Sequence, residues 1–214
     1  MKPWIRRLWP VAVVVGFACY PGRFDAVGDF DSVSTVTAPG ADFAGITTFS
    51  LQDSVVHLVP PGDEDEVDHT LDAFTLDRTR QNLLALGWTE IVAPDANNEP
   101  DVVVQVAATS STYIGYTYPW WAYWGYWWGW GYGPGWGVGY PPVIIPYEFS
   151  TGTLLLQMLD LRGTDSQNPA GTLPVIWIAG ANGLLDGASN AELQVRIGQA
   201  IDQAFEQTPQ LVQP

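Results

Sequence analysis

The chain has 214 residues, with 23 Asp and Glu against 8 Lys and Arg, which gives a formal net charge of −15. A surface that binds phosphates needs a basic patch, so this balance argues against a nucleic-acid partner. The hydrophobic content of 47% is enough to build a core, which separates the chain from disordered acidic tails. A single Cys excludes a disulfide within the chain and a zinc site built from several Cys.

The amino terminus has the pattern of a secretory signal. Three basic residues stand within the first seven positions, and an apolar stretch follows from Leu8 to Ala18. This stretch is too short to span a bilayer as a stable helix. Cys19 stands at the point of expected cleavage, so the segment resembles a bacterial lipobox, in which that Cys is lipidated and becomes the mature N-terminus. We expect a signal peptide over residues 1–18 and a lipid anchor at Cys19; the alternative is a plain signal peptide with an incidental thiol.

The charge of the mature chain bears on how it is attached. Removing residues 1–18 takes away three of the eight basic residues and no acidic residue, which moves the net charge from −15 to −18. So acidic a surface repels anionic headgroups, and we expect attachment to the lipid bilayer through acyl chains. Tyr20, where inner-membrane retention uses Asp, resembles enterobacterial sorting to the outer membrane. The expected location is therefore the cell envelope of a Gram-negative-type bacterium, at the outer membrane facing the periplasm.

Residues 19–40 contain scattered Pro, Gly, Asp and Ser, which indicates a tether ahead of a folded domain over residues 41–214. Alternating and β-branched runs in that domain predict five strands, over residues 43–51, 89–92, 102–107, 153–161 and 173–179. The polar stretch 162–171 joins the last two strands as an antiparallel hairpin.

Two helices are expected. The first has Asp68 or Thr70 as N-cap and stops at Gly87. Its apolar positions are Leu71, Phe74, Leu83, Leu84 and Leu86. The second begins with a capping box made by Ser189 and Glu192, and it ends before Pro209. Its apolar positions, at helical spacing, are Leu193, Ile197, Ile201, Ala204 and Phe205.

These elements predict an α+β fold. We expect an antiparallel or mixed sheet of about five strands with two helices packed on one face. The expected order is β-α-β-β-β-β-α, with a long aromatic and Gly-rich insert, residues 113–147, between strands.

The insert carries most of the aromatic residues of the chain and no charge from Val102 to Tyr147. Its Pro and Gly content makes a transmembrane helix a poor interpretation. Trp and Tyr favour membrane interfaces and also stack on sugar rings. The insert is thus either a low-complexity hairpin tip or a surface that contacts membrane, an envelope protein or polysaccharide. The candidate binding residues are Trp120, Trp121, Trp124, Trp127, Trp128, Trp130 and Trp136.

Other candidate chemistry is weaker. His57 and His69 flank an acidic run, residues 63–68, but the pattern of a calcium loop is absent, so a solvated, helix-capping loop is preferred and no metal site is predicted. There is no Gly-x-Ser-x-Gly elbow and no phosphate loop, so no catalytic residue and no cofactor are predicted. Asp101 and Asp160 are interpreted as acceptors for backbone N–H groups at strand ends. Trp177 is assigned to the core.

Several short motifs follow one another along the mature chain. They are Asp42-Phe43-Ala44-Gly45-Ile46-Thr47-Thr48-Phe49, Leu86-Gly87-Trp88, Pro100-Asp101-Val102-Val103-Val104, Gly152-Thr153-Leu154 and Val175-Ile176-Trp177-Ile178-Ala179-Gly180. Together with the lipobox and the terminal helix, they resemble the small bacterial lipoproteins grouped as domain of unknown function 4136 (DUF4136). The resemblance implies a fold and a location but no catalytic residues.

Two functional hypotheses follow. The first is an exported, lipid-anchored, non-catalytic module that binds or scaffolds a partner through its aromatic insert. The second is an envelope hydrolase or glycan-processing accessory, which would need two carboxylates that face each other across a cleft.

Overall fold

A computed structural model describes residues 32–58, 69–95, 97–109, 113–114, 137–139, 148–149, 152–164, 172–184 and 189–212. The longer strands are β1 (Ser32–Thr37), β2 (Thr48–Leu51), β5 (Val102–Thr109), β9 (Thr153–Asp160) and β10 (Thr172–Asn182). The shorter ones are β3 (Val56–His57), β4 (Thr89–Glu90), β6 (Tyr113–Ile114), β7 (Gly137–Gly139) and β8 (Glu148–Phe149). The helices are α1 (Asp72–Ala85) and α3 (Asn190–Glu206), with 3₁₀ turns η2 (His69–Leu71) and η3 (Pro209–Leu211).

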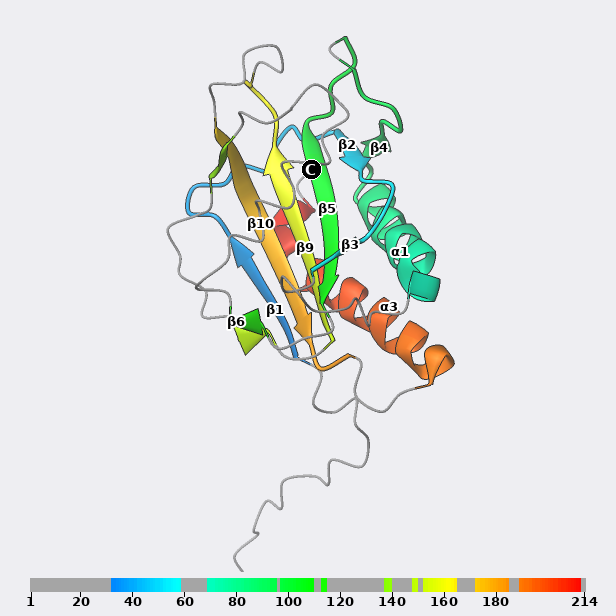
Figure 1. Ribbon diagram of the computed structural model, residues 1–214. Coiled ribbons are helices and arrows are strands. Elements are labelled where there is room, and N and C mark those ends of the chain that lie inside the picture. Colours follow the sequence, from blue (N-terminus) through cyan, green and yellow to red (C-terminus); the bar gives the residue numbers. More distant parts are fainter. Residues whose placement is uncertain are drawn as a thin grey trace, which may run out of the picture.

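The strands form one mixed sheet in the order β1-β10-β9-β5-β2-β4, with β3 also beside β5 (Figure 1). Strands β1, β10, β9 and β5 are antiparallel neighbours, whereas β2, β3 and β4 pair in parallel. Among the described residues this sheet has seven strands; β7 adds a short parallel pairing at the start of β10, and β6 pairs with β8 alone. The α+β class, the mixed sheet and the β9–β10 hairpin are confirmed, but the predicted strand count and order are wrong.

The first missed strand is β1. It pairs with β10 over six residues, from Ser32 opposite Asn182 to Thr37 opposite Trp177. The tether predicted over residues 19–40 is therefore too long, and the domain boundary at residue 41 is wrong. The physical reason is that β-branched residues favour a strand and Val33 packs against the core, although most of the segment is polar. Such a segment suits the edge of a sheet, where β1 lies.

Helix α1 starts later than expected. The chain makes the turn η2 first, and Leu71 occupies the N-cap position without a side-chain cap, so neither Asp68 nor Thr70 is the N-cap. The stop at Gly87 is confirmed, because its φ of +85° is a conformation that glycine adopts without strain.

The buried face of α1 also differs from the predicted one. Of the expected apolar positions, Leu83 is fully buried, but Leu84 is 47% exposed. Thr75 and Thr79 are buried in its place, and each hydroxyl donates to the carbonyl four residues earlier. A hydrophobic pattern alone does not find such positions, because Thr satisfies its own hydroxyl within the helix.

Helix α3 matches its prediction. The Ser189 side chain accepts from the Glu192 N–H, and the Glu192 carboxylate accepts from the Ser189 N–H at 2.9 Å, which completes the capping box. The five predicted apolar positions are all buried. No helix in the described part of the chain is long and apolar enough to cross a membrane.

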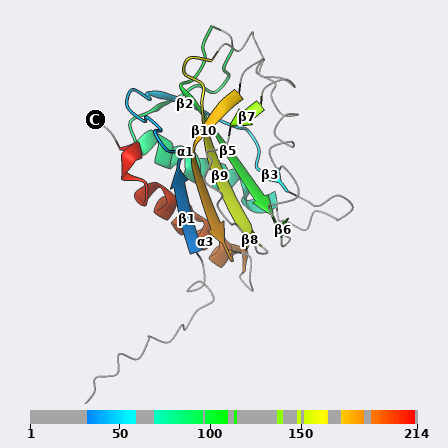
Figure 2. The same cartoon turned by 90° about the vertical axis from the view of Figure 1, so that its left-hand side faces the viewer.

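Both helices cover one face of the sheet (Figure 2). The main core lies between them and the inward side chains of β2, β5, β9 and β10, among them Phe49, Val104 and Met158. Trp177 is fully buried in this core, as expected, and its indole N–H donates to the Thr208 hydroxyl at 2.9 Å.

The other face of the sheet is also apolar. A second buried cluster consists of Val103, Leu159, Leu161, Leu173, Val175 and Ile178. Because alternate residues of a strand point to opposite faces, Val103 lies on the side away from α1 and α3, which pack against its neighbours. The Gln157 side-chain amide donates to the Gln105 carbonyl oxygen within this same, helix-free face. The central strands are therefore buried on both faces.

Candidate functional site

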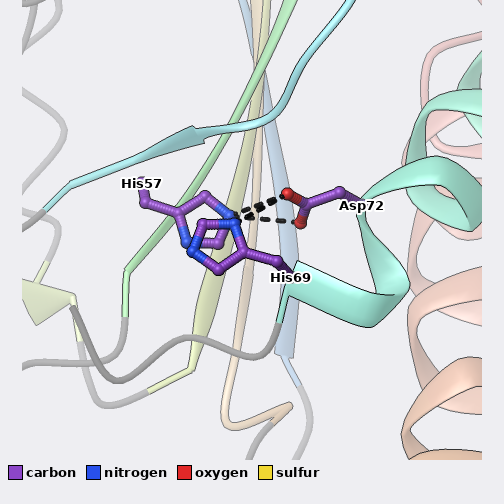
Figure 3. Close-up of side chains that lie close together, drawn as sticks. All are labelled: His57, His69 and Asp72. Carbon is purple, nitrogen blue, oxygen red and sulfur yellow. Dashed lines mark hydrogen bonds and ion pairs between the residues drawn. The ribbon is translucent and has the colours of Figure 1, made fainter.

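Two histidines and one aspartate come together where the sheet meets the start of α1 (Figure 3). His57 ends the short strand β3, His69 opens the turn η2, and Asp72 is the first residue of α1. The pairing of β3 with β5 fixes His57 opposite Ala108, and the turn brings His69 and Asp72 onto one side of the chain. The potential ligand atoms of the three side chains all lie within 4.8 Å of one another.

The Asp72 carboxylate is the common partner of both imidazole rings. His57 Nε2 lies 3.1 Å from each carboxylate oxygen, and His69 Nδ1 lies 3.2 Å from Oδ2. The two rings stack with their centroids 3.8 Å apart and their planes 5° from parallel. One carboxylate therefore holds two imidazole nitrogens that point in the same direction.

The cluster is buried at one end and open at the other. The His57 side chain is 6% exposed and the Asp72 side chain 25%, whereas that of His69 is 63% exposed. Asp72 also sits in the first turn of α1, where the helix macrodipole favours a negative charge. The Asp72 carboxylate thus lies between a buried imidazole, that of His57, and a solvent-accessible one, that of His69.

The sequence drew attention to the two histidines but predicted no metal site. It connected His57 and His69 with the acidic run 63–68, which lies outside the described residues. Asp72 provides the carboxylate that the structure describes, and it was missed. A usable signal was present: His69 and Asp72 are three residues apart at a helix start, and side chains at that spacing share a face.

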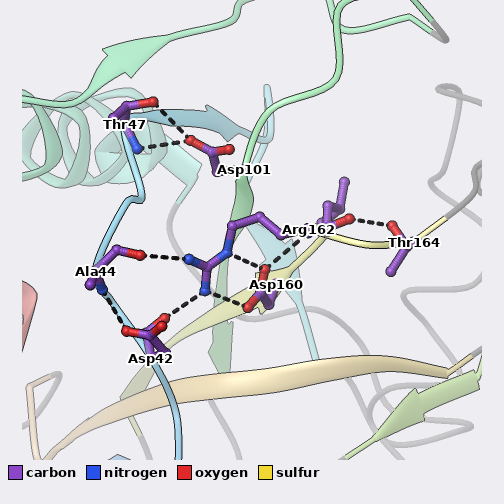
Figure 4. Close-up of polar contacts among 8 residues, drawn as sticks. Asp42, Ala44, Thr47, Asp101, Asp160, Arg162 and Thr164 are labelled. Atoms are coloured by element: carbon purple, nitrogen blue, oxygen red, sulfur yellow. Dashed lines mark hydrogen bonds and ion pairs between the residues drawn. The ribbon is translucent and has the colours of Figure 1, made fainter.

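A second polar cluster surrounds Arg162, just after β9 (Figure 4). Its guanidinium donates through Nε and Nη2 to the two oxygens of Asp160, at 2.9 and 2.7 Å, and through Nη1 to the Ala44 carbonyl at 2.9 Å. Nη2 also donates to the Asp42 carbonyl. The hydrogen bond to Asp160 and the negative charges of Asp160, Asp42 and Asp101 raise the pKa of Arg162 above its ordinary value, although burial opposes them. The side chain fastens the loop before β2 to the end of β9.

Asp101, beside this cluster, accepts from the Thr47 N–H at 2.8 Å and the Thr48 N–H at 2.9 Å. Burial alone would raise the pKa of Asp101, but these hydrogen bonds outweigh it and hold the pKa below its ordinary value. The interpretation of Asp101 and Asp160 as acceptors for backbone N–H groups is confirmed, since Asp160 also accepts from the Arg162 N–H at 3.0 Å. Both carboxylates are committed to holding the chain together.

The remaining predicted site residues, Cys19 and the seven Trp from Trp120 to Trp136, lie outside the described residues. Within the insert, the short strands on either side of residues 115–136, the aromatic stretch that contains the seven Trp, are described. Strand β6, before it, pairs with β8, which ends just before the start of β9. Strand β7, after it, pairs with the start of β10. Because β9 and β10 are antiparallel, β6 and β7 lie toward opposite ends of the sheet (Figure 2).

Comparison with known proteins supports the fold and names the family. No curated protein matches the chain. A crystal structure of a DUF4136 family protein from Bacteroides thetaiotaomicron aligns with a TM-score of 0.64 and 26% identity, over 85% of this chain and 97% of that one. Two PelC dodecamer structures from Paraburkholderia phytofirmans align with TM-scores of 0.39 and identities of 10% and 12%, over 86% of this chain and 99% of theirs. That similarity is too low to carry an argument.

The family model described as "Domain of unknown function (DUF4136)" matches residues 33–210, a range that starts within β1 and ends within η3. The match therefore covers every described strand but the first residue of β1, and both helices. On this evidence the chain belongs to the DUF4136 family.

Proposed function

We propose that this protein is an exported, lipid-anchored module of the cell envelope that binds or scaffolds a partner and is not itself an enzyme. Cys19 carries the acyl chains, and the domain faces the periplasm from the outer membrane. The aromatic stretch with its seven Trp contacts membrane, a neighbouring envelope protein or polysaccharide. No nucleic acid takes part, because the chain has a net charge of −15.

The observation that carries the proposal is the position of the strands that flank the aromatic stretch. They lie toward opposite ends of the sheet, and the sheet's helix-free face bears the second apolar cluster. A long uncharged stretch rich in Trp, whose flanking strands lie toward opposite ends of the sheet, suits the contact of a large surface better than the cradling of a small substrate.

The polar clusters also favour binding over hydrolysis. A glycan hydrolase needs two carboxylates that face each other with room for substrate or water between them. The Asp101 carboxylate accepts hydrogen bonds from two backbone N–H groups, and the two oxygens of Asp160 accept from Nε and Nη2 of Arg162. Neither group is available for proton transfer without breaking the contacts that join β2, β5 and β9.

The anchor is tested by palmitate labelling and membrane fractionation of the wild-type chain and the Cys19→Ser variant. We expect label and sedimentation with membranes for the wild type, and loss of label in the variant. Equal labelling of both chains would overturn the anchor assignment.

The binding role is tested in the Cys19→Ser background, so that the anchor does not mask weaker contacts. One chain keeps the seven Trp, and a second has all seven replaced by Ser. We expect the first chain, but not the second, to sediment with phosphatidylethanolamine–phosphatidylglycerol vesicles, to be retained by envelope polysaccharide or to cross-link to an envelope protein. Identical behaviour in all three assays would refute the role of the aromatic stretch.

A further inference from the structure

We propose that His57, His69 and Asp72 form a binding site for a divalent transition-metal ion, with Zn²⁺ as the expected occupant. The juxtaposition is specific: two imidazoles from different elements meet one carboxylate, and the potential ligand atoms lie within 4.8 Å of one another. The site is independent of the lipid anchor and of the aromatic stretch, so its test does not depend on the function proposed above.

The spacing of the donor atoms suits a tetrahedral ion. With metal–ligand bonds of about 2.0–2.1 Å, the ligand atoms of a tetrahedral zinc site lie about 3.3–3.4 Å apart. The nitrogen–oxygen distances from His57 and His69 to Asp72 are 3.1 and 3.2 Å. The two nitrogen–oxygen distances therefore need to change by only a few tenths of an ångström, whereas the two nitrogens, within 4.8 Å of each other, need a movement of one ring to share an ion.

The donor set selects the class of metal. Two imidazole nitrogens and one carboxylate oxygen suit Zn²⁺ and its neighbours in the transition series, whereas Ca²⁺ and Mg²⁺ prefer oxygen ligands alone. Three protein ligands of this kind leave a fourth position for water or another group. The strongly acidic chain, with a net charge of −15, raises the local concentration of cations around the site.

The stacking of the two imidazole rings means that one of them must move before both can bind one ion. A metal lies in the plane of an imidazole that binds it, along the nitrogen lone pair. Stacked rings hold their nitrogen lone pairs in two separate planes, and here the planes are 5° from parallel with the ring centroids 3.8 Å apart. One ion cannot lie in both planes, so one ring must tilt for both nitrogens to bind it. We assign the movement to His69, since its side chain is 63% exposed, whereas that of His57 is 6% exposed.

A purely structural alternative explains the same contacts. Each neutral imidazole can donate its N–H to Asp72, and the cluster then joins β3 to the start of α1 without any metal. This alternative predicts loss of stability when the cluster is altered but no metal affinity. The two explanations therefore differ in a measurable quantity.

The test uses the full-length chain, purified in detergent without a polyhistidine tag and stripped with EDTA. ZnCl₂ is titrated in by calorimetry, and CoCl₂ by visible absorption, where a four-coordinate site gives intense bands. We expect one Zn²⁺ per chain with micromolar or tighter affinity. Because even outer-shell changes cost about 10–100-fold in metal affinity, His69→Ala and Asp72→Asn should each weaken binding at least about tenfold. His69 is exposed, so its variant should remain folded by circular dichroism.

Asp77→Asn is the matched control, because Asp77 lies on the same helix with a side chain that is 58% exposed. It should bind Zn²⁺ as the wild type does. The proposal is overturned if the wild-type chain binds no Zn²⁺, or if both His69→Ala and Asp72→Asn bind it unchanged. Displacement of Zn²⁺ by an equal concentration of Ca²⁺ would also overturn it, since that behaviour indicates an all-carboxylate site.

Discussion

Arg78 of α1 and Asp202 of α3 form a double hydrogen-bonded ion pair that joins the two helices across 124 residues of sequence. Arg78 Nε donates to Asp202 Oδ1 at 2.7 Å, and the Asn82 amide donates to the same oxygen at 2.9 Å. The hydrogen bond to Asp202 raises the pKa of Arg78. Burial alone would raise the pKa of Asp202, but its hydrogen bonds to Arg78 and Asn82 hold that pKa below its ordinary value.

Removing the negative charge of Asp202 should weaken the contact between α1 and α3. We expect Asp202→Asn to lower the free energy of unfolding by about 1 kcal/mol, since both partners are partly exposed and water screens the charges. Urea unfolding of the purified chain measures the difference. Glu206→Gln, an exposed change on the same helix, should leave the midpoint unchanged; a drop of equal size there would point to loss of net charge as the cause.

Asp101 should make stability depend on pH in the acid range. Its pKa is lower in the folded chain than in the unfolded chain, so its contribution is complete above the unfolded pKa of about 3.9. That contribution disappears as the pH falls through the folded pKa. We expect Asp101→Asn to be less stable than wild type at pH 7 by about 1 kcal/mol, with the gap closing toward pH 3. Thermal unfolding across this range, with Asp53→Asn as control, checks it; a gap that is constant with pH would contradict the assignment.

Ser50 offers a stabilising substitution. It lies in β2, fully buried, and within the described part of the chain its hydroxyl has no hydrogen-bond partner. A buried polar group in that state costs about 1–3 kcal/mol. We therefore expect Ser50→Ala to raise the melting temperature measured by calorimetry. Thr153→Ala is the contrasting variant, because its hydroxyl is buried but donates to Asn182, and it should lower the melting temperature.

The Trp177–Thr208 hydrogen bond should couple β10 to the end of α3. Thr208→Val leaves the buried indole N–H unpaired, which should cost about 1–3 kcal/mol. Trp177→Phe removes the donor and also leaves a gap beside Phe205, whose ring centroid lies 5.2 Å away. In the double variant the loss should be smaller than the sum of the single losses, because the orphaned donor is then absent. Strict additivity in denaturant titrations would show that the bond contributes nothing.

The elements that sequence predicted well are those with a complete local signal. The capping box at Ser189 and the run of buried positions that follows it mark α3 without reference to the rest of the fold. Gly87 likewise marks the end of α1 through its own backbone conformation. In these cases the residues that determine the structure are neighbours in the chain.

The features that were missed depend on distant partners. Ser32–Thr37 becomes a strand only because β10 offers an open edge, and the Pro and Gly around it suggested a tether. The His57–Asp72 contact depends on the pairing of β3 with β5, and a strand of two residues is too short to be predicted from its sequence pattern. Arg162 reaches across 118 residues to the Ala44 carbonyl, a contact that no local pattern contains.

The position of β1 sets how far the domain can stand from a lipid bilayer. With the anchor at Cys19 as proposed, thirteen Cα–Cα steps separate it from Ser32, the first residue of β1, and they reach at most about 45 Å when fully extended. Ser32 lies in the edge strand β1, opposite Asn182 of β10. A pull on the proposed anchor would therefore act directly on the edge strand β1 and on its pairing with β10.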